Sequence, residues 1–168
     1  MEKPQLVAAD TNVILRLASG DDATVDAWQL LRRRVQGVQF LALPTVLGEI
    51  GAKVTGDADP LVHAAALKAL RELRPRWEFQ PVIFNAVQQA IADNARDRLR
   101  EAGLVPWQER NDAAILSESA TMECILLVSG DSHLLSIDHE RLAFLFRQLD
   151  LATPLIASPE RLLRDFFR

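Results

Sequence analysis

One stretch near the start of the chain decides the fold, and it reads Leu6-Val7-Ala8-Ala9-Asp10-Thr11-Asn12-Val13-Ile14-Leu15-Arg16-Leu17. An apolar run ends at a carboxylate, and after two small polar residues an apolar pattern resumes with helical spacing. Residues 6–9 are apolar on both faces, which is typical of a central parallel strand. Ligands of open α/β sheets bind at the carboxyl ends of strands, where Asp10 would stand. The stretch therefore predicts an α/β fold with a ligand at this edge.

The rest of the chain alternates between strand-like and helix-like segments. Strands are expected at residues 5–9, 38–43, 77–83, 125–129 and 155–157. Helices are expected at 13–18, from 21 or 22 to about 36, at 46–54, 61–74, 82–102 and 112–122, from 132, and at 160–167, with an amphipathic segment at 141–149. Parallel neighbours require crossover helices, so this order predicts a three-layer α/β architecture. We expect a mainly parallel sheet of about five strands flanked by helices.

Several helix starts carry residues that can cap them. Asp21 or Asp22, Thr45, Asp59 and Ser158 each stand before a helical pattern, and side chains of this kind accept hydrogen bonds from the first free backbone N–H groups. Proline follows Asp59 and Ser158, in the first helical position. These signals predict where the helices begin.

Size and composition place the chain among ordinary globular proteins. Its 168 residues are 49% hydrophobic and 25% charged, which predicts one domain spanning residues 1–168 with its own core. The single cysteine, Cys124, lies in an apolar context and is expected in that core. The formal net charge of -4 gives no overall basic character that would indicate nucleic-acid binding. The local arginine clusters are most simply interpreted as solvent-exposed helix faces.

We expect a soluble, cytoplasmic protein that does not enter a membrane. No apolar run approaches the roughly 18 residues of a membrane span. Residues 1–4 lead straight into a short strand-like run and lack the features of a signal peptide. One cysteine also fits a reducing compartment.

Four carboxylates stand where such a fold could bring them together. Asp10 and Asp131 follow apolar strands, while Glu49 and Asp112 lie near the starts of helices. If the strands are parallel, all four reach the same end of the sheet. Crowded carboxylates repel one another, and a hard cation such as Mg²⁺ or Mn²⁺ removes that penalty. We therefore predict that these four residues bind one or two divalent ions, with Asp10 and Asp112 at the main ion.

Each acid also has a purely local interpretation. Asp10 and Asp112 can cap or begin helices, Asp131 can occupy a turn after Gly130, and Glu49 can be a surface residue. The prediction of a metal site therefore depends on all four acids occurring at positions that an α/β fold could bring together.

Three neighbouring polar residues can support this site. Asn12 could orient a metal-bound water, and Thr11 and Ser129 could bond neighbouring carboxylates; local capping is the simpler interpretation of all three. The three histidines have no spacing that predicts a zinc site.

Four motifs resemble those of PIN-domain proteins, especially the VapC-type toxin ribonucleases. They are residues 10–17 with Gly20-Asp21-Asp22, residues 45–50 around Glu49, residues 111–116 around Asp112, and residues 128–135 around Asp131. In the last motif this family usually carries a threonine, where the chain has Ser129. The resemblance implies a Rossmann-like PIN fold and a Mg²⁺- or Mn²⁺-dependent endoribonuclease whose metal-binding acids are Asp10, Glu49, Asp112 and Asp131. It also implies a homodimer and control by an antitoxin encoded alongside.

Three other functions are alternatives to a nuclease. A PIN-like RNA-binding or scaffolding protein without turnover is the main alternative. A haloacid-dehalogenase-type phosphohydrolase would carry a second aspartate at position 12, where Asn12 stands. A response-regulator receiver would carry an acid pair at the end of its first strand, which here ends in Asp10 alone. The sequence thus favours a nuclease that hydrolyses RNA with a metal-activated water.

Overall fold

Five parallel strands form the central sheet of this computed structural model, which describes residues 3–56 and 59–166. The strand order is β3-β2-β1-β4-β5. The strands are β1 (Gln5–Ala9), β2 (Val38–Ala42), β3 (Phe79–Pro81), β4 (Leu126–Val128) and β5 (Leu155–Ala157). Strand β1 lies at the centre, where Val7 pairs with Phe40 of β2 and with Leu126 of β4. The predicted parallel sheet is confirmed.

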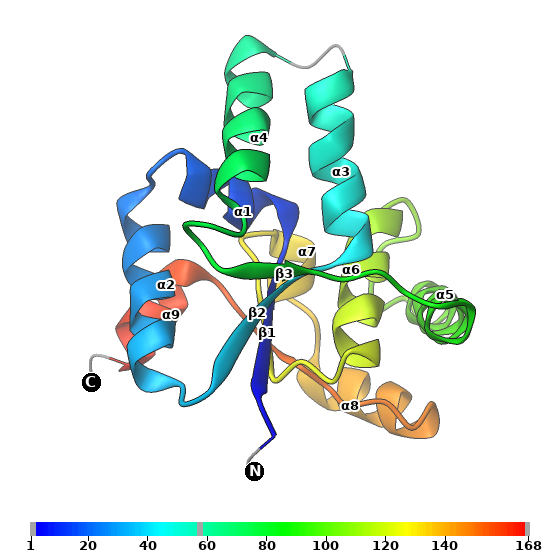
Figure 1. Cartoon of the computed structure of the whole chain (residues 1–168). Helices are drawn as coiled ribbons and strands as arrows, with labels where there is room; N and C mark the ends of the chain where they lie inside the picture. The colour runs from blue at the N-terminus through cyan, green and yellow to red at the C-terminus, as the bar shows by residue number, and fades with distance from the viewer. Residues whose placement is uncertain (1–2, 57–58, 167–168) are drawn as a thin grey trace.

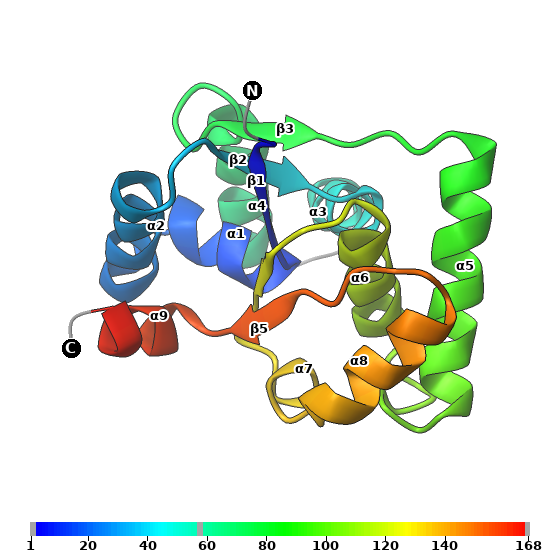
Figure 2. The ribbon, with the colours of Figure 1, turned by 90° about the horizontal axis from the view of Figure 1, so that it is seen from below.

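Helices cover both faces of the sheet. They are α1 (Thr11–Ala18), α2 (Asp22–Arg34), α3 (Pro44–Thr55), α4 (Pro60–Glu72), α5 (Ala86–Glu101), α6 (Arg110–Thr121), α7 (Ser132–Leu135), α8 (His139–Gln148) and α9 (Pro159–Phe166). Figures 1 and 2 both show α2 and α9 side by side on one flank and α5, α6 and α8 on the other. Helices α3 and α4 pack against each other and project beyond the end of the sheet (Figure 1).

The core forms where apolar strand residues meet the buried faces of the helices. Trp28 of α2 packs on the rings of Phe40 and Phe79, with ring centroids 4.4 and 5.0 Å away. These contacts fasten α2 to β2 and β3. Cys124 is buried as expected, and burial raises the pKa of its thiol to about 12. Within the described ranges no helix is long and apolar enough to cross a membrane.

Most predicted helix starts are confirmed by their caps. The side chains of Asp21, Asp59 and Ser158 accept hydrogen bonds from backbone N–H groups in the first turns of α2, α4 and α9. Phe167, the last residue of the predicted C-terminal helix, lies outside the described residues. Residues 1 and 2, at the start of the predicted N-terminal segment 1–4, also lie outside them.

Several helix starts differ from the prediction: α1 and α6 begin two residues earlier than expected, at Thr11 and Arg110. Helix α5 begins at Ala86 rather than at residue 82, because Asn85 and Gln88 form a capping box there. Val82, where the helix was predicted to begin, instead follows β3, and its backbone N–H donates a hydrogen bond to the carbonyl of Ala42 in β2. Helix α3 begins at Pro44 and has no side-chain cap of its own, since the hydroxyl of Thr45 donates instead to Glu118 of α6.

Candidate metal and phosphodiester site

The four predicted acids line one cavity of about 310 Å³ at the carboxyl end of the sheet. Asp10 follows β1, Glu49 lies one turn into α3, Asp112 lies in the first turn of α6, and Asp131 precedes α7. The cavity is lined by Asp10, Thr11, Asn12, Leu15, Glu49, Lys53, Asp112, Ile115 and Asp131. Because β1 and β4 are neighbouring parallel strands, the two acids that follow them emerge at the same edge.

Asp10 caps a helix and lines the cavity at the same time. Its Oδ1 accepts a hydrogen bond from the backbone N–H of Val13 at 3.0 Å, while its Oδ2 accepts one from the hydroxyl of Ser129. Burial raises the pKa of the Asp10 carboxyl, and the charges of Asp131 and Glu49 raise it further. The bonds from Ser129 and Val13 oppose this shift.

Two more acids are held by neighbouring donors. The hydroxyl of Thr11 donates to Oε1 of Glu49 at 2.9 Å. Oδ1 of Asp131 accepts hydrogen bonds from the N–H groups of His133 and Leu134 at 2.7 and 3.3 Å. Thr11 therefore bonds a neighbouring carboxylate, as Ser129 does, and the hydroxyl of Ser129 also accepts a local hydrogen bond from the backbone N–H of Asp131 at 3.0 Å.

Asp112 is the acid with the fewest partners. Burial raises the pKa of its carboxyl to about 7, helped by the negative charges of Asp131, Glu109, Asp10 and Glu49. Its Oδ2 is buried and accepts no hydrogen bond from the described part of the chain. A cation or a proton would satisfy this atom, because a buried polar group without a partner is costly.

The four carboxylates have the right chemistry for a hard cation, but in this structure they are too far apart to share one. Carboxylate oxygens are the ligands that Mg²⁺ and Mn²⁺ prefer, and each ionised carboxylate has about four acceptor positions, so one or two hydrogen bonds leave room for a metal. Across residues 3–56 and 59–166, however, no three His, Cys, Asp or Glu side chains stand close enough together to hold one ion. A bound ion would require the acids to draw closer around the cavity.

The structure adds lining residues that the sequence reasoning missed. Lys53 lies one turn after Glu49 on α3, and Ile115 lies one turn after Asp112 on α6. Helical spacing from the two predicted acids would have found both. Lys53 places a positive charge beside four carboxylates, which suits an anionic substrate.

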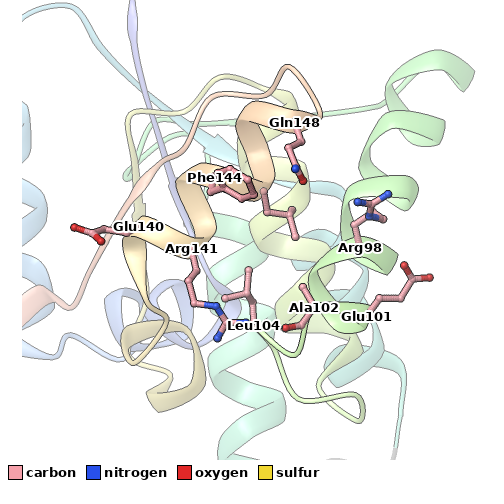
Figure 3. Close-up of a pocket in the computed structure, with 9 residues that line it drawn as sticks. Arg98, Glu101, Ala102, Leu104, Glu140, Arg141, Phe144 and Gln148 are labelled. Carbon is pink, nitrogen blue, oxygen red and sulfur yellow. Dashed lines mark hydrogen bonds between the residues drawn. The ribbon is translucent and has the colours of Figure 1, made fainter.

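A larger cavity, of about 550 Å³, lies between α5 and α8 and contains none of the four acids. Figure 3 shows Arg98 and Glu101 on one wall and Phe144 and Gln148 on the other. Its charges are of both signs and no residue set there resembles a reaction centre, so the smaller cavity is the candidate site.

The fold is similar to that of a chain in the crystal structure of VapBC2 from Rickettsia felis bound to a DNA fragment from their promoter. The two chains superpose with a TM-score of 0.59 over 90% of this chain and 98% of that one, at 15% sequence identity. This likeness shows the fold, a three-layer α/β arrangement around a parallel sheet like that of the VapBC2 chain. No protein-family model matches the sequence, and no curated protein is significantly similar to it.

Proposed function

We propose that this chain is a metal-dependent endoribonuclease with a PIN-like domain spanning residues 1–168. One observation carries the proposal. Asp10, Glu49, Asp112 and Asp131 come from four separate segments and line a single cavity. Like charges at one place repel one another unless a cation neutralises them, and ligands of open α/β sheets bind at this end of the sheet.

Seven polar residues in or beside the cavity would have a role in this reaction. Asp10, Glu49, Asp112 and Asp131 would hold one or two Mg²⁺ or Mn²⁺ ions, which supply an activated water and stabilise the charge on the phosphodiester. Ser129 orients Asp10 through its hydroxyl and receives the N–H of Asp131, so it fixes these two acids relative to each other. Lys53 would attract the phosphate, and Asn12 would orient a water at the cavity wall.

The fold likeness to a VapBC2 chain and the motif resemblance support a proposal about the biological setting. We propose that the protein is the toxin of a bacterial toxin–antitoxin pair, acts in the cytoplasm, and binds an antitoxin protein. The similar structure contains VapBC2. A homodimer is also proposed, since Val87 and Ile91 lie one turn apart on α5 and are exposed, as is Ile83 three residues before the helix begins.

The alternative is a PIN-like RNA-binding or scaffolding protein without turnover. The spacing of the acids favours it, because no three of them among the described residues are close enough for one ion. The two proposals differ in whether RNA is cut.

A cleavage assay decides between them. The purified chain is incubated with Mn²⁺ and a single-stranded RNA blocked at both ends, so that only internal cuts are seen. We expect wild-type cleavage and a loss on the order of 100-fold or more in Asp10→Asn and Asp112→Asn, because each would remove a ligand of the ion that stabilises transition-state charge. Asn at position 10 can still cap α1, which protects the fold.

The matched control is Asp97→Asn, the same chemical change at an exposed position of α5 outside the cavity. It should cut RNA as the wild type does. If activity survives in both cavity variants, the proposed site is wrong; if RNA is bound but never cut, the alternative is correct.

A further inference from the structure

Trp107 is an exposed tryptophan in the turn that joins α5 to α6. Its exposed fraction is 62%, whereas the chain's other tryptophans, Trp28 and Trp77, are buried in the core. The core contacts of Trp28 explain that residue fully. Trp107 presents a large flat ring to solvent, and its position needs a separate explanation.

Arg100 holds Trp107 in a fixed arrangement. The guanidinium carbon lies over the indole, 3.9 Å from the ring centroid. The same guanidinium donates two hydrogen bonds, from Nε and Nη2, to the carbonyl oxygen of Trp107 at 3.0 and 2.6 Å. These bonds go to a neutral carbonyl, so they leave the positive charge of Arg100 uncompensated. One face of the ring is thus covered by a cation, and the exposure of the ring leaves the other face for a ligand.

The turn connects this ring to the acid-lined cavity. A backbone bond of 2.9 Å from the N–H of Glu109 to the carbonyl of Pro106 closes the turn. Glu109 precedes α6, and its Oε1 lies 3.7 Å from Nε2 of His133, two residues beyond Asp131. Trp107 stands five residues before Asp112, a chain length of at most ~18 Å. The ring therefore lies within a short stretch of chain from the cavity.

We propose that Trp107, backed by Arg100, is a stacking platform for a base of single-stranded RNA whose neighbouring phosphodiester occupies the acid-lined cavity. The inference rests on the function proposed above. Unpaired bases stack on aromatic rings and on arginine planes, and such stacking tolerates any base because every base has a flat face. A preformed ring with a cation behind it, beside a cavity for phosphates, combines the two interactions that single-stranded nucleic acid requires.

The test uses the full chain with a short homopolymeric RNA in EDTA, so that no metal-dependent cleavage occurs. Binding is measured by fluorescence anisotropy for the wild type, Trp107→Ala, Trp107→Phe and Arg100→Lys. We expect the alanine variant to bind about 5- to 100-fold more weakly. The phenylalanine and lysine variants should lose less, because a smaller ring or a non-planar cation remains. The matched control is Phe144→Ala, an equally exposed aromatic at 62% on α8, which should bind as the wild type does.

Tryptophan fluorescence provides a second readout. Because Trp28 and Trp77 are buried, the RNA should quench mainly the emission of Trp107, and Trp107→Phe should lack that quenching. Wild-type affinity in Trp107→Ala, or equal quenching in Trp107→Phe, would overturn the inference and leave the ring as a contact for a protein.

Cleavage of the same RNA with Mn²⁺ separates this inference from the nuclease itself. We expect Trp107→Ala to raise KM with kcat little changed, because the ring contacts substrate away from the reacting atoms. If the wild type binds RNA through Trp107 and does not cut it, the platform stands and the nuclease proposal falls. If the wild type cuts RNA and Trp107→Ala has an unchanged KM, the platform falls and the nuclease stands.

Discussion

Among single residues, Asp112 couples function to stability most directly. Its carboxyl has a pKa of about 7 in the folded protein, against an ordinary value of 3.8, because it is partly buried among other acids. The folded state therefore binds this proton more tightly than the unfolded state does. Its contribution to stability is greatest at low pH and declines as the pH rises from about 4 to about 7.

Asp112→Asn should therefore stabilise the metal-free protein at pH 8 while abolishing cleavage. We expect a gain of about 1–2 kcal/mol in the free energy of unfolding, less than the full pKa shift implies because the residue is partly exposed. For a chain of this size that raises the Tm by a few degrees. The difference should shrink as the pH is lowered from 7 towards 4. Thermal unfolding in EDTA measures it.

Asp97→Asn, in the same buffers, controls for the loss of a charge. Two results would contradict the raised pKa of the Asp112 carboxyl. One is an Asp112→Asn variant less stable than wild type at pH 8, and the other is a stability difference between the two proteins that does not change with pH.

At the scale of elements, helix α3 depends on α6 for its N-terminal cap. Both oxygens of the buried Glu118 carboxylate accept hydrogen bonds from Thr45, one from its N–H at 3.0 Å and one from its hydroxyl at 2.6 Å. Burial raises the pKa of the Glu118 carboxyl, and the two bonds oppose that shift. Glu49 lies one turn further along α3, so this contact also sets where Glu49 stands relative to Asp112 on α6.

Thr45→Val keeps the shape of the side chain and removes only its hydroxyl. We expect the free energy of unfolding in urea to fall by about 1.5–3 kcal/mol, because a buried charged acceptor loses a donor. The affinity for Mn²⁺, measured by calorimetry, should fall as well because Glu49 loses its fixed position. Thr45→Ser retains the hydroxyl and should stay close to wild type. Equal values for the valine and serine variants would mean that the bond to Glu118 does not set the position of α3.

At the scale of the whole molecule, the cavity exists only when the sheet is complete. Its four acids come from distant positions between 10 and 131 in the sequence. They line one cavity because β1 lies between β2 and β4. An ion bound there contacts the folded chain and not the unfolded one, so binding and folding are linked.

Mn²⁺ should therefore raise the Tm of the wild-type protein. At a concentration 100 times the Kd, the expected stabilisation is about 2.7 kcal/mol, which corresponds to roughly 5–11 °C for this chain length. EDTA should reverse the shift, and Asp10→Asn should lose most of it. A similar shift in wild type and Asp10→Asn would place the ion elsewhere.

The sequence by itself determined the features that depend on near neighbours. The strand at residues 5–9, the caps at Asp21, Asp59 and Ser158, and the strand-end acids Asp10 and Asp131 could all be predicted. Periodicity, capping and turn chemistry act over a few residues, so the sequence records them directly. The start of α5 was predicted too early because apolar residues continue back to Val82 in the sequence. In the structure the backbone N–H of Val82 bonds to β2, so the helix cannot include it.

The tertiary structure alone decided which distant groups meet. It joined Thr11 to Glu49 and Thr45 to Glu118 through hydrogen bonds across 38 and 73 positions, and it raised the pKa of Asp112 through burial among other acids. It also buried Trp28 and exposed Trp107, two residues of the same type. The stretch from Leu6 to Leu17 indicated a strand, an acid and a helix. Strand order and helix packing turned that acid into one wall of a cavity, because contacts between distant segments depend on how whole elements pack.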